Sequence, residues 1–200
     1  MRIELNARPA VFKAMGKKAP RTGRAVYKTL IAGTREEVYR ELTRTDRPLR
    51  AWPNARLCTP GLEAEARLQL RTATGEHTLA DGVVLAHDPP RRFSHTVCYT
   101  RYRDPAFIVI YELREARIDV ELTLTLEELP LGTRTARQAM REAPHVLGTL
   151  KRVVEKGEPD VMARVRHIWA SLMEFSLPAD MLAERWPLEA ARRTTTTLKS

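Results

Sequence analysis

Alternating apolar and polar residues predict a run of β-strands in the first two-thirds of the chain. Residues 62–71 place leucines and alanines on one side and charged or amide side chains on the other, and residues 117–127 repeat this alternation. A period of two is typical of an antiparallel strand with one buried and one wet face. With the segments rich in β-branched and aromatic residues, the pattern predicts strands at 24–31, 62–71, 77–87, 92–100, 106–114 and 117–127.

The period then changes from two to about 3.6, which predicts a long helix over residues 134–156. Its apolar residues share one face, Lys156 lies in its last turn, and Gly157 follows as a natural stop. Pro144 falls inside this helix, so we expect a kink or a junction there.

Two shorter helices are predicted nearer the N-terminus. Thr34 is a typical N-cap, and Glu37 completes a capping box with it at the start of the first helix. Residues 46–53 predict a second short helix, closed by Pro53.

The order of elements predicts an α+β fold. After the short helices come at least five successive strands joined by short turns such as Thr74-Gly75 and Asp88-Pro89-Pro90. Such a run favours an antiparallel meander, whose apolar face the long helix must cover.

A further amphipathic segment follows the long helix. Its first apolar stripe and the apolar residues after Pro178 are too hydrophobic to remain in water. Three arrangements are open: packing on the same domain, which we favour, a lid, or an interface for a second copy or another protein through residues 161–186. The residues concerned are Val161, Val165, Ile168, Trp169, Leu172, Met173, Phe175, Met181, Leu182 and Trp186.

The formal net charge of +9 is carried entirely by the chain ends. Residues 1–24 and 190–200 are basic, whereas residues 25–189 hold equal numbers of basic and acidic side chains. A nucleic-acid or anionic-membrane partner would therefore have to be recognised by the ends, and we expect none. No apolar run is long enough for a membrane span, no secretory signal is recognisable, and Cys58 and Cys98 fit a reduced, cytoplasmic protein.

Three stretches of the sequence carry a family resemblance. The first is TREEVYREL at residues 34–42, the second is Trp52, followed by Pro60-Gly61, and the third and most specific is the hairpin GVVLAHDPPRRF at residues 82–93. Together they resemble the START-like (SRPBCC) superfamily, and within it the bacterial proteins similar to the C-terminal domain of the activator of heat-shock protein 90 ATPase. The first stretch resembles the opening helix of that family.

The resemblance implies a helix-grip fold over residues 24–157, in which a curved antiparallel sheet wraps around the long C-terminal helix. Residues 1–23 are then a basic N-terminal extension, and residues 158–200 a helical C-terminal extension with a basic tail. In this superfamily the space between sheet and helix often holds a hydrophobic small molecule.

Aromatic and apolar side chains on the expected sheet and long helix are candidates to line such a cavity. Phe93, His95, Val97 and Tyr99 share one side of their strand, and tyrosines add a polar group to an apolar wall. The full candidate set is Tyr27, Trp52, Phe93, His95, Val97, Tyr99, Phe107, Tyr111, Leu122, Met140, Leu147 and Leu150.

Three functions remain open from the sequence. The first is binding of a hydrophobic or amphipathic small molecule, the second is a co-chaperone-like protein-interaction module, and the third is a cyclase- or dehydratase-like enzyme. A buried His95 facing a tyrosine would suit the enzyme. No catalytic, phosphate-binding or metal-binding motif is recognisable, so we expect no catalytic residue, metal or cofactor.

Overall fold

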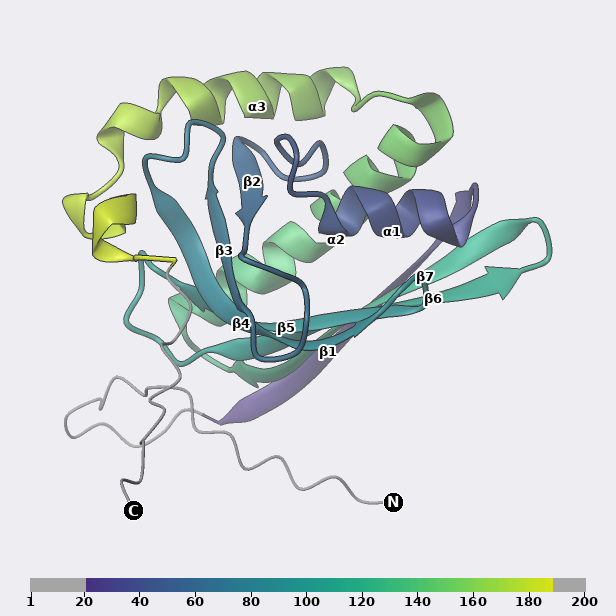
Figure 1. The fold of residues 1–200 in the computed structure, drawn as a ribbon, viewed down its shortest axis with the longest axis horizontal. Coiled ribbons are helices and arrows are strands. Elements are labelled where there is room, and N and C mark those ends of the chain that lie inside the picture. The colour runs from purple at the N-terminus through teal and green to yellow at the C-terminus, as the bar shows by residue number, and fades with distance from the viewer. Residues whose placement is uncertain (1–20, 189–200) are drawn as a thin grey trace, which may run out of the picture.

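A computed structural model describes residues 21–188 and shows a seven-stranded antiparallel sheet curved around a long helix (Figure 1). The strand order is β1-β7-β6-β5-β4-β3-β2, so every strand from β2 to β7 lies beside its neighbour in sequence. The strands are β1 (Thr22–Ala32), β2 (Ala55–Cys58), β3 (Arg67–Thr72), β4 (Thr78–Asp88), β5 (Arg92–Tyr99), β6 (Phe107–Ala116) and β7 (Asp119–Pro130). The α+β helix-grip prediction is confirmed.

Helix α2 (Arg134–Lys156) has the predicted bounds and lies in the concave side of the sheet (Figure 1). Its buried face consists of small and aliphatic residues that pack on β1 and β7, and Gly157 ends it in the left-handed conformation at φ 79°. The helix runs through Pro144 as a single element, so the expected junction is absent.

Helix α1 (Arg35–Thr43) begins as predicted. Thr34 Oγ1 accepts from the Glu37 amide at 3.2 Å, and the Glu37 carboxylate accepts from the Thr34 amide at 2.9 Å. This capping box satisfies two amides that the first helical turn leaves without partners. Val38, Tyr39 and Leu42 bury the opposite face of the helix against the end of α2 and the sheet.

Two sequence predictions about local structure are wrong, and one short strand was missed. Residues 46–53 form turns instead of a helix, because Leu49 pairs with Ala55 in an isolated bridge. The strand expected at 62–71 begins only at Arg67, since Glu65 takes a left-handed conformation at φ 70° that breaks the extended backbone. The short strand β2 was not predicted.

The C-terminal extension adds helix α3 (Val161–Leu172) and three short 3-10 turns, at Glu174–Ser176, Ala179–Met181 and Ala183–Arg185. Figure 1 shows α3 lying across the domain on the side of β2 and β3. Its apolar stripe faces outward: Ile168 is 58%, Trp169 62% and Phe175 84% exposed. The stripe on α3 therefore does not pack on its own domain as we expected, whereas Met181, from the same apolar set, is 3% exposed and does. The basic ends lie largely outside the described residues.

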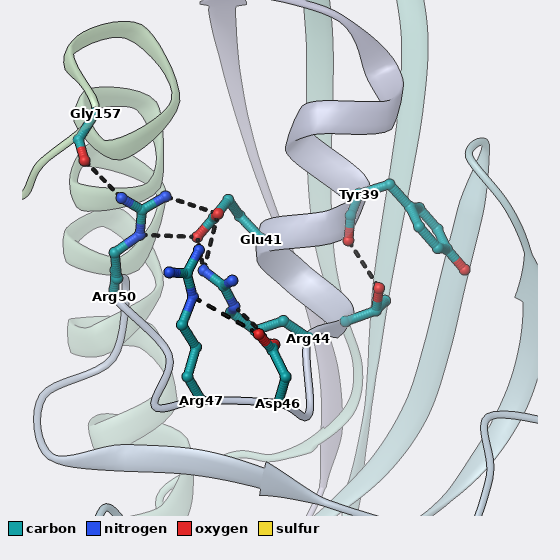
Figure 2. Close-up of polar contacts among 8 residues, drawn as sticks. Tyr39, Glu41, Arg44, Asp46, Arg47, Arg50 and Gly157 are labelled. Carbon is teal, nitrogen blue, oxygen red and sulfur yellow. Dashed lines mark hydrogen bonds and ion pairs between the residues drawn. The ribbon is translucent and has the colours of Figure 1, made fainter.

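A buried carboxylate joins α1 to the segment that follows it (Figure 2). Glu41 is 5% exposed and accepts hydrogen bonds from the guanidinium groups of both Arg44 and Arg50, at distances of 2.7–3.1 Å. Arg50 also donates to the carbonyl of Gly157, where α2 ends. Burial raises the pKa of Glu41, but the hydrogen bond from Arg50 and the charges of both arginines outweigh it, so the pKa lies below its ordinary value of 4.5.

We predict that Glu41→Gln lowers the free energy of unfolding by about 3–5 kcal/mol, because it leaves two arginines without their buried counter-charge. The depressed pKa of Glu41 means that its contribution is complete above pH 4.5 and is lost as the pH falls through the folded value. Urea denaturation at neutral and acidic pH measures both effects. Glu36→Gln, on the exposed side of the same helix, is the matched control. Equal free energies of unfolding for Glu41→Gln and Glu36→Gln would contradict the stabilising role of the buried Glu41 carboxylate.

Candidate ligand-binding cavity

An apolar cavity of about 110 Å³ lies between the sheet and α2. We call it the inner cavity. Strands β5 and β6 form its floor, α2 contributes Ala139, Glu142, Ala143 and Val146, and the turn after α1 contributes Leu49 and Trp52. Alanines at two of the four α2 positions keep this helix from filling the space, so the cavity results from residue size on α2.

Strand alternation places the β5 residues around this cavity. Phe93, His95, Val97 and Tyr99 all line it, because every second residue of a strand faces the same side. Gly82 on β4 lets the two strands approach, since a Cβ there would lie 1.9 Å from the Thr96 carbonyl oxygen. Seven of the twelve candidate residues meet here: Trp52, Phe93, His95, Val97, Tyr99, Phe107 and Tyr111.

The other five candidates lie outside the inner cavity. Leu122, Leu147 and Leu150 are at most 4% exposed and belong to the filled core between the sheet and α2. Met140 is 38% exposed because it lies on the outer side of α2. Tyr27 lies on the edge strand β1, and its hydroxyl donates to the carbonyl of Met140 at 3.3 Å.

His95 brings a neutral hydrogen-bonding group into the inner cavity. Its Nδ1 lies 3.0 Å from the carbonyl oxygen of Thr96, and because a carbonyl only accepts, Nδ1 carries the proton and Nε2 is left as an acceptor. Burial lowers the pKa of His95 to about 4, against which the Thr96 hydrogen bond acts only weakly. The Tyr111 ring stacks beside the imidazole with centroids 6.3 Å apart, and burial raises the pKa of its hydroxyl.

A second polar group, on α2, borders the inner cavity. The Tyr99 hydroxyl donates to Glu142 Oε2 at 2.9 Å, and the Gln138 amide donates to Oε1 at 2.8 Å. Burial raises the pKa of Glu142 despite these two hydrogen bonds. Burial and the neighbouring Glu142 carboxylate raise the pKa of Tyr99 well above its ordinary value.

A larger hollow of about 440 Å³ adjoins the inner cavity on the side of α3. We call it the outer chamber. Five residues line both spaces: Trp52, Leu70, Tyr99, Glu142 and Val146. The outer chamber also has polar walls, which the sequence reasoning missed. Its polar residues include Arg101, Gln138, Arg141, His145, Thr149, Arg166 and His167.

The polar α2 residues of the outer chamber follow helical spacing. Gln138, Arg141, His145 and Thr149 recur at three- or four-residue intervals, beside the apolar face. This second stripe is visible in the sequence, but the charged face of a helix is normally assigned to solvent. Only α3, which lies over the stripe, makes it one wall of a hollow, and Arg141 and His145 in this wall stay exposed to solvent.

Glu174, in the turn directly after α3, binds the loops beneath it and so holds α3 beside the outer chamber. Its carboxylate accepts from the Asn54 amide at 2.9 Å and from the Thr74 hydroxyl, and it lies 3.5 Å from His77 Nδ1. Burial raises the pKa of Glu174, yet hydrogen bonds from Thr72, Thr74 and Asn54 bring it below its ordinary value. Among residues 21–188, Glu76, His77 and Glu174 are the one group close enough to share a metal ion, with ligand atoms within 4.8 Å. Because protein donors already occupy both Glu174 oxygens, these contacts serve to dock α3.

Solved structures of low sequence identity share this fold. They include the Aha1 dimer from Colwellia psychrerythraea (16% identity, TM-score 0.54, 68% of this chain and 98% of the other). They also include protein MLL2253 from Mesorhizobium loti (18% identity, TM-score 0.57, 67% of this chain and 98% of the other). A third is protein CV1439 from Chromobacterium violaceum (17% identity, TM-score 0.53, 68% of this chain and 98% of the other).

No curated protein matches the sequence significantly. No helix among the described residues is long and apolar enough to cross a membrane. The sequence model described as "Activator of Hsp90 ATPase homolog 1-like protein" matches residues 32–155, which span α1, the meander from β2 to β7 and nearly all of α2. The resemblance seen in the three sequence stretches is thereby confirmed, and the chain belongs to the Activator of Hsp90 ATPase homolog 1-like family.

Proposed function

We propose that this protein binds a small molecule with an apolar part in the inner cavity. The observation that carries the proposal is the space itself, since about 110 Å³ between sheet and helix is left open while the surrounding core is closely packed. Its walls are aromatic and aliphatic, with a few polar groups at fixed positions, as in ligand pockets generally.

The size of the inner cavity limits what enters it. Ligand sites usually have a volume of a few hundred cubic ångströms, and the inner cavity is smaller. A dry cavity of about 150 Å³ in another protein accepts benzene. The buried part of the ligand is therefore on the scale of one aromatic ring or a short alkyl chain.

Binding fits the polar groups of the inner cavity better than catalysis. A general acid or base works best with a pKa near the working pH. The pKa of His95 is lowered to about 4 and that of Tyr111 is raised, so both groups stay neutral at neutral pH. They serve as a hydrogen-bond acceptor and donor that orient a ligand.

A second candidate function is self-association through the exposed face of α3. Val161, Ile168, Trp169 and Leu172 are each 58–64% exposed, which is an unusually apolar surface for one short helix. The Colwellia psychrerythraea protein is described as a dimer, which supports a second copy as the occupant. We place both functions in the cytoplasm, because Cys58 and Cys98 are free thiols.

We predict that toluene binds the wild-type protein and raises its melting temperature, because a ligand that binds only the folded state stabilises it. Ala143→Phe fills the inner cavity and abolishes binding, as measured by calorimetry, whereas Met140→Leu on the exposed side of α2 does not. Ala139→Met is a milder filling variant in case the larger ring costs about 1–3 kcal/mol of stability. Unchanged toluene affinity in both filling variants would disprove the site.

We predict that His95→Gln flattens the pH dependence of stability between pH 6.5 and about 4. Between these pH values His95 is protonated in the unfolded state but stays neutral in the folded state. The free energy of unfolding of the wild-type protein therefore decreases as the pH falls, by at most about 1.4 kcal/mol per pH unit. Denaturation with urea across this range measures the slope. His145→Gln is the control, because His145 lines the outer chamber but is exposed to solvent, unlike the buried His95. A slope unchanged by His95→Gln would show that His95 titrates normally.

We predict that Ile168→Asp converts a dimer to a monomer in sedimentation velocity. A charge at the centre of an apolar interface leaves a buried group without a partner. Ile118→Asp is the matched control, because Ile118 is 90% exposed in the turn between β6 and β7, far from α3 in sequence. A wild-type protein that is monomeric at micromolar concentration would exclude this second function.

A further inference from the structure

The outer chamber collects arginines from three separate elements. Arg101 comes from the loop after β5, Arg141 from α2 and Arg166 from α3. Bringing like charges to one hollow is unfavourable unless a counter-charge is present or arrives. Within residues 21–188, no carboxylate lies within ion-pair distance of these three side chains. Other arginines, such as Arg103 and Arg114, are unpaired too, but these three differ from them in lining one hollow together.

The other titratable groups of the outer chamber do not neutralise the arginines. Glu142 accepts hydrogen bonds from Tyr99 and Gln138 where the two spaces adjoin. Burial raises the pKa of Glu142 and the charge of Arg141 acts to lower it, but the two side chains form no ion pair, and one carboxylate cannot balance three arginines. His167 is occupied on both nitrogens: Nε2 donates to the Arg50 carbonyl at 3.1 Å, and Nδ1 accepts from the Asn54 amide at 3.4 Å. The unpaired charge of the chamber is therefore positive.

The two adjoining spaces thus differ in chemistry. The inner cavity is apolar and of single-ring size, whereas the outer chamber is four times larger and positively charged. The five residues common to both walls put them side by side. One molecule with an apolar end and an anionic end matches both.

We propose that the ligand is an amphiphilic carboxylate, whose apolar end enters the inner cavity and whose carboxylate meets Arg141 and Arg166 in the outer chamber. This inference rests on the proposed function and names the chemical class of its ligand. The planar guanidinium group donates two parallel hydrogen bonds, which fit a carboxylate. Since Arg166 belongs to α3, the C-terminal extension supplies part of the site.

The test compares phenylbutyrate with phenylbutanol, which share a phenyl ring and a short chain and differ in the charged end. We expect phenylbutyrate to bind the wild-type protein about 10-fold tighter at low salt, the effect of one good charge-assisted hydrogen bond. High salt should narrow the difference, because the arginines are exposed to solvent. Isothermal titration calorimetry measures both affinities.

The double variant Arg141→Gln with Arg166→Gln separates this inference from the proposed function. We expect it to bring phenylbutyrate down to the affinity of phenylbutanol and to leave phenylbutanol unchanged. Arg103→Gln is the matched control, since Arg103 is exposed in the loop of Arg101 but lines neither space. Ala143→Phe should weaken both probes.

Each outcome decides a different statement. If both probes bind equally, or if the double variant keeps the preference for phenylbutyrate, the carboxylate site is wrong while the apolar cavity stands. If neither probe binds, both proposals are wrong. A preference lost equally in Arg103→Gln would show that only the general positive charge of the surface attracts the anion, which also overturns the site.

Discussion

The buried charge of Glu41 constrains the part of the molecule on which the candidate site depends. A carboxylate removed from water needs partners, and those partners are Arg44 and Arg50 in the following segment. The chain after α1 must therefore turn back toward α1 instead of continuing as a helix. This return places Leu49 and Trp52 over the inner cavity. It also brings Arg50 to the Gly157 carbonyl, so the same guanidinium fixes the point where the chain leaves α2 for α3.

The C-terminal extension forms one wall of the outer chamber, and helix α3 in it has an unusual distribution of polar and apolar residues. Amphipathic helices of globular proteins usually turn their apolar face inward. Helix α3 and the turn after it instead direct Ala163, His167 and Glu174 inward, where the two ionisable side chains find partners in Asn54, Thr74 and the Arg50 carbonyl. The inward face is polar because it covers a chamber with polar walls, and the apolar residues are left outside. The same helix thereby lines the outer chamber on one face and exposes apolar residues on the other, where the proposed ligand and the proposed second copy would bind.

The sequence predicted those elements whose signals are local. The capping box at Thr34, the alternation of β5 and β7, and the apolar face of α2 each specify an element within one segment, and all were found. The errors occur where distant residues decide. Pro53 suggested the end of a short helix at residues 46–53, but hydrogen bonds from Arg50 to Glu41 on α1 hold this segment in turns. Alternation suggested a strand at residues 62–66, but the left-handed conformation of Glu65 interrupts the extended backbone there. The β5 residues of the inner cavity could be read from strand parity alone, whereas the arginines of the outer chamber come together only when three remote segments meet.

Small residues on α2 and large ones on the sheet explain why this core contains a cavity at all. Towards its C-terminal end, α2 presents Leu147, Leu150 and Val153, which close the core completely. Towards its N-terminal half it presents Ala139 and Ala143, and the opposing rings of Phe93, Tyr99 and Tyr111 are held on strands that cannot move inward. A single change of side-chain volume along one helix face therefore divides the space under the sheet into a filled half and an open half. Because the filled half supplies the packing that stabilises the fold, a change of side chain in the open half alters the shape or polarity of the cavity without removing that packing.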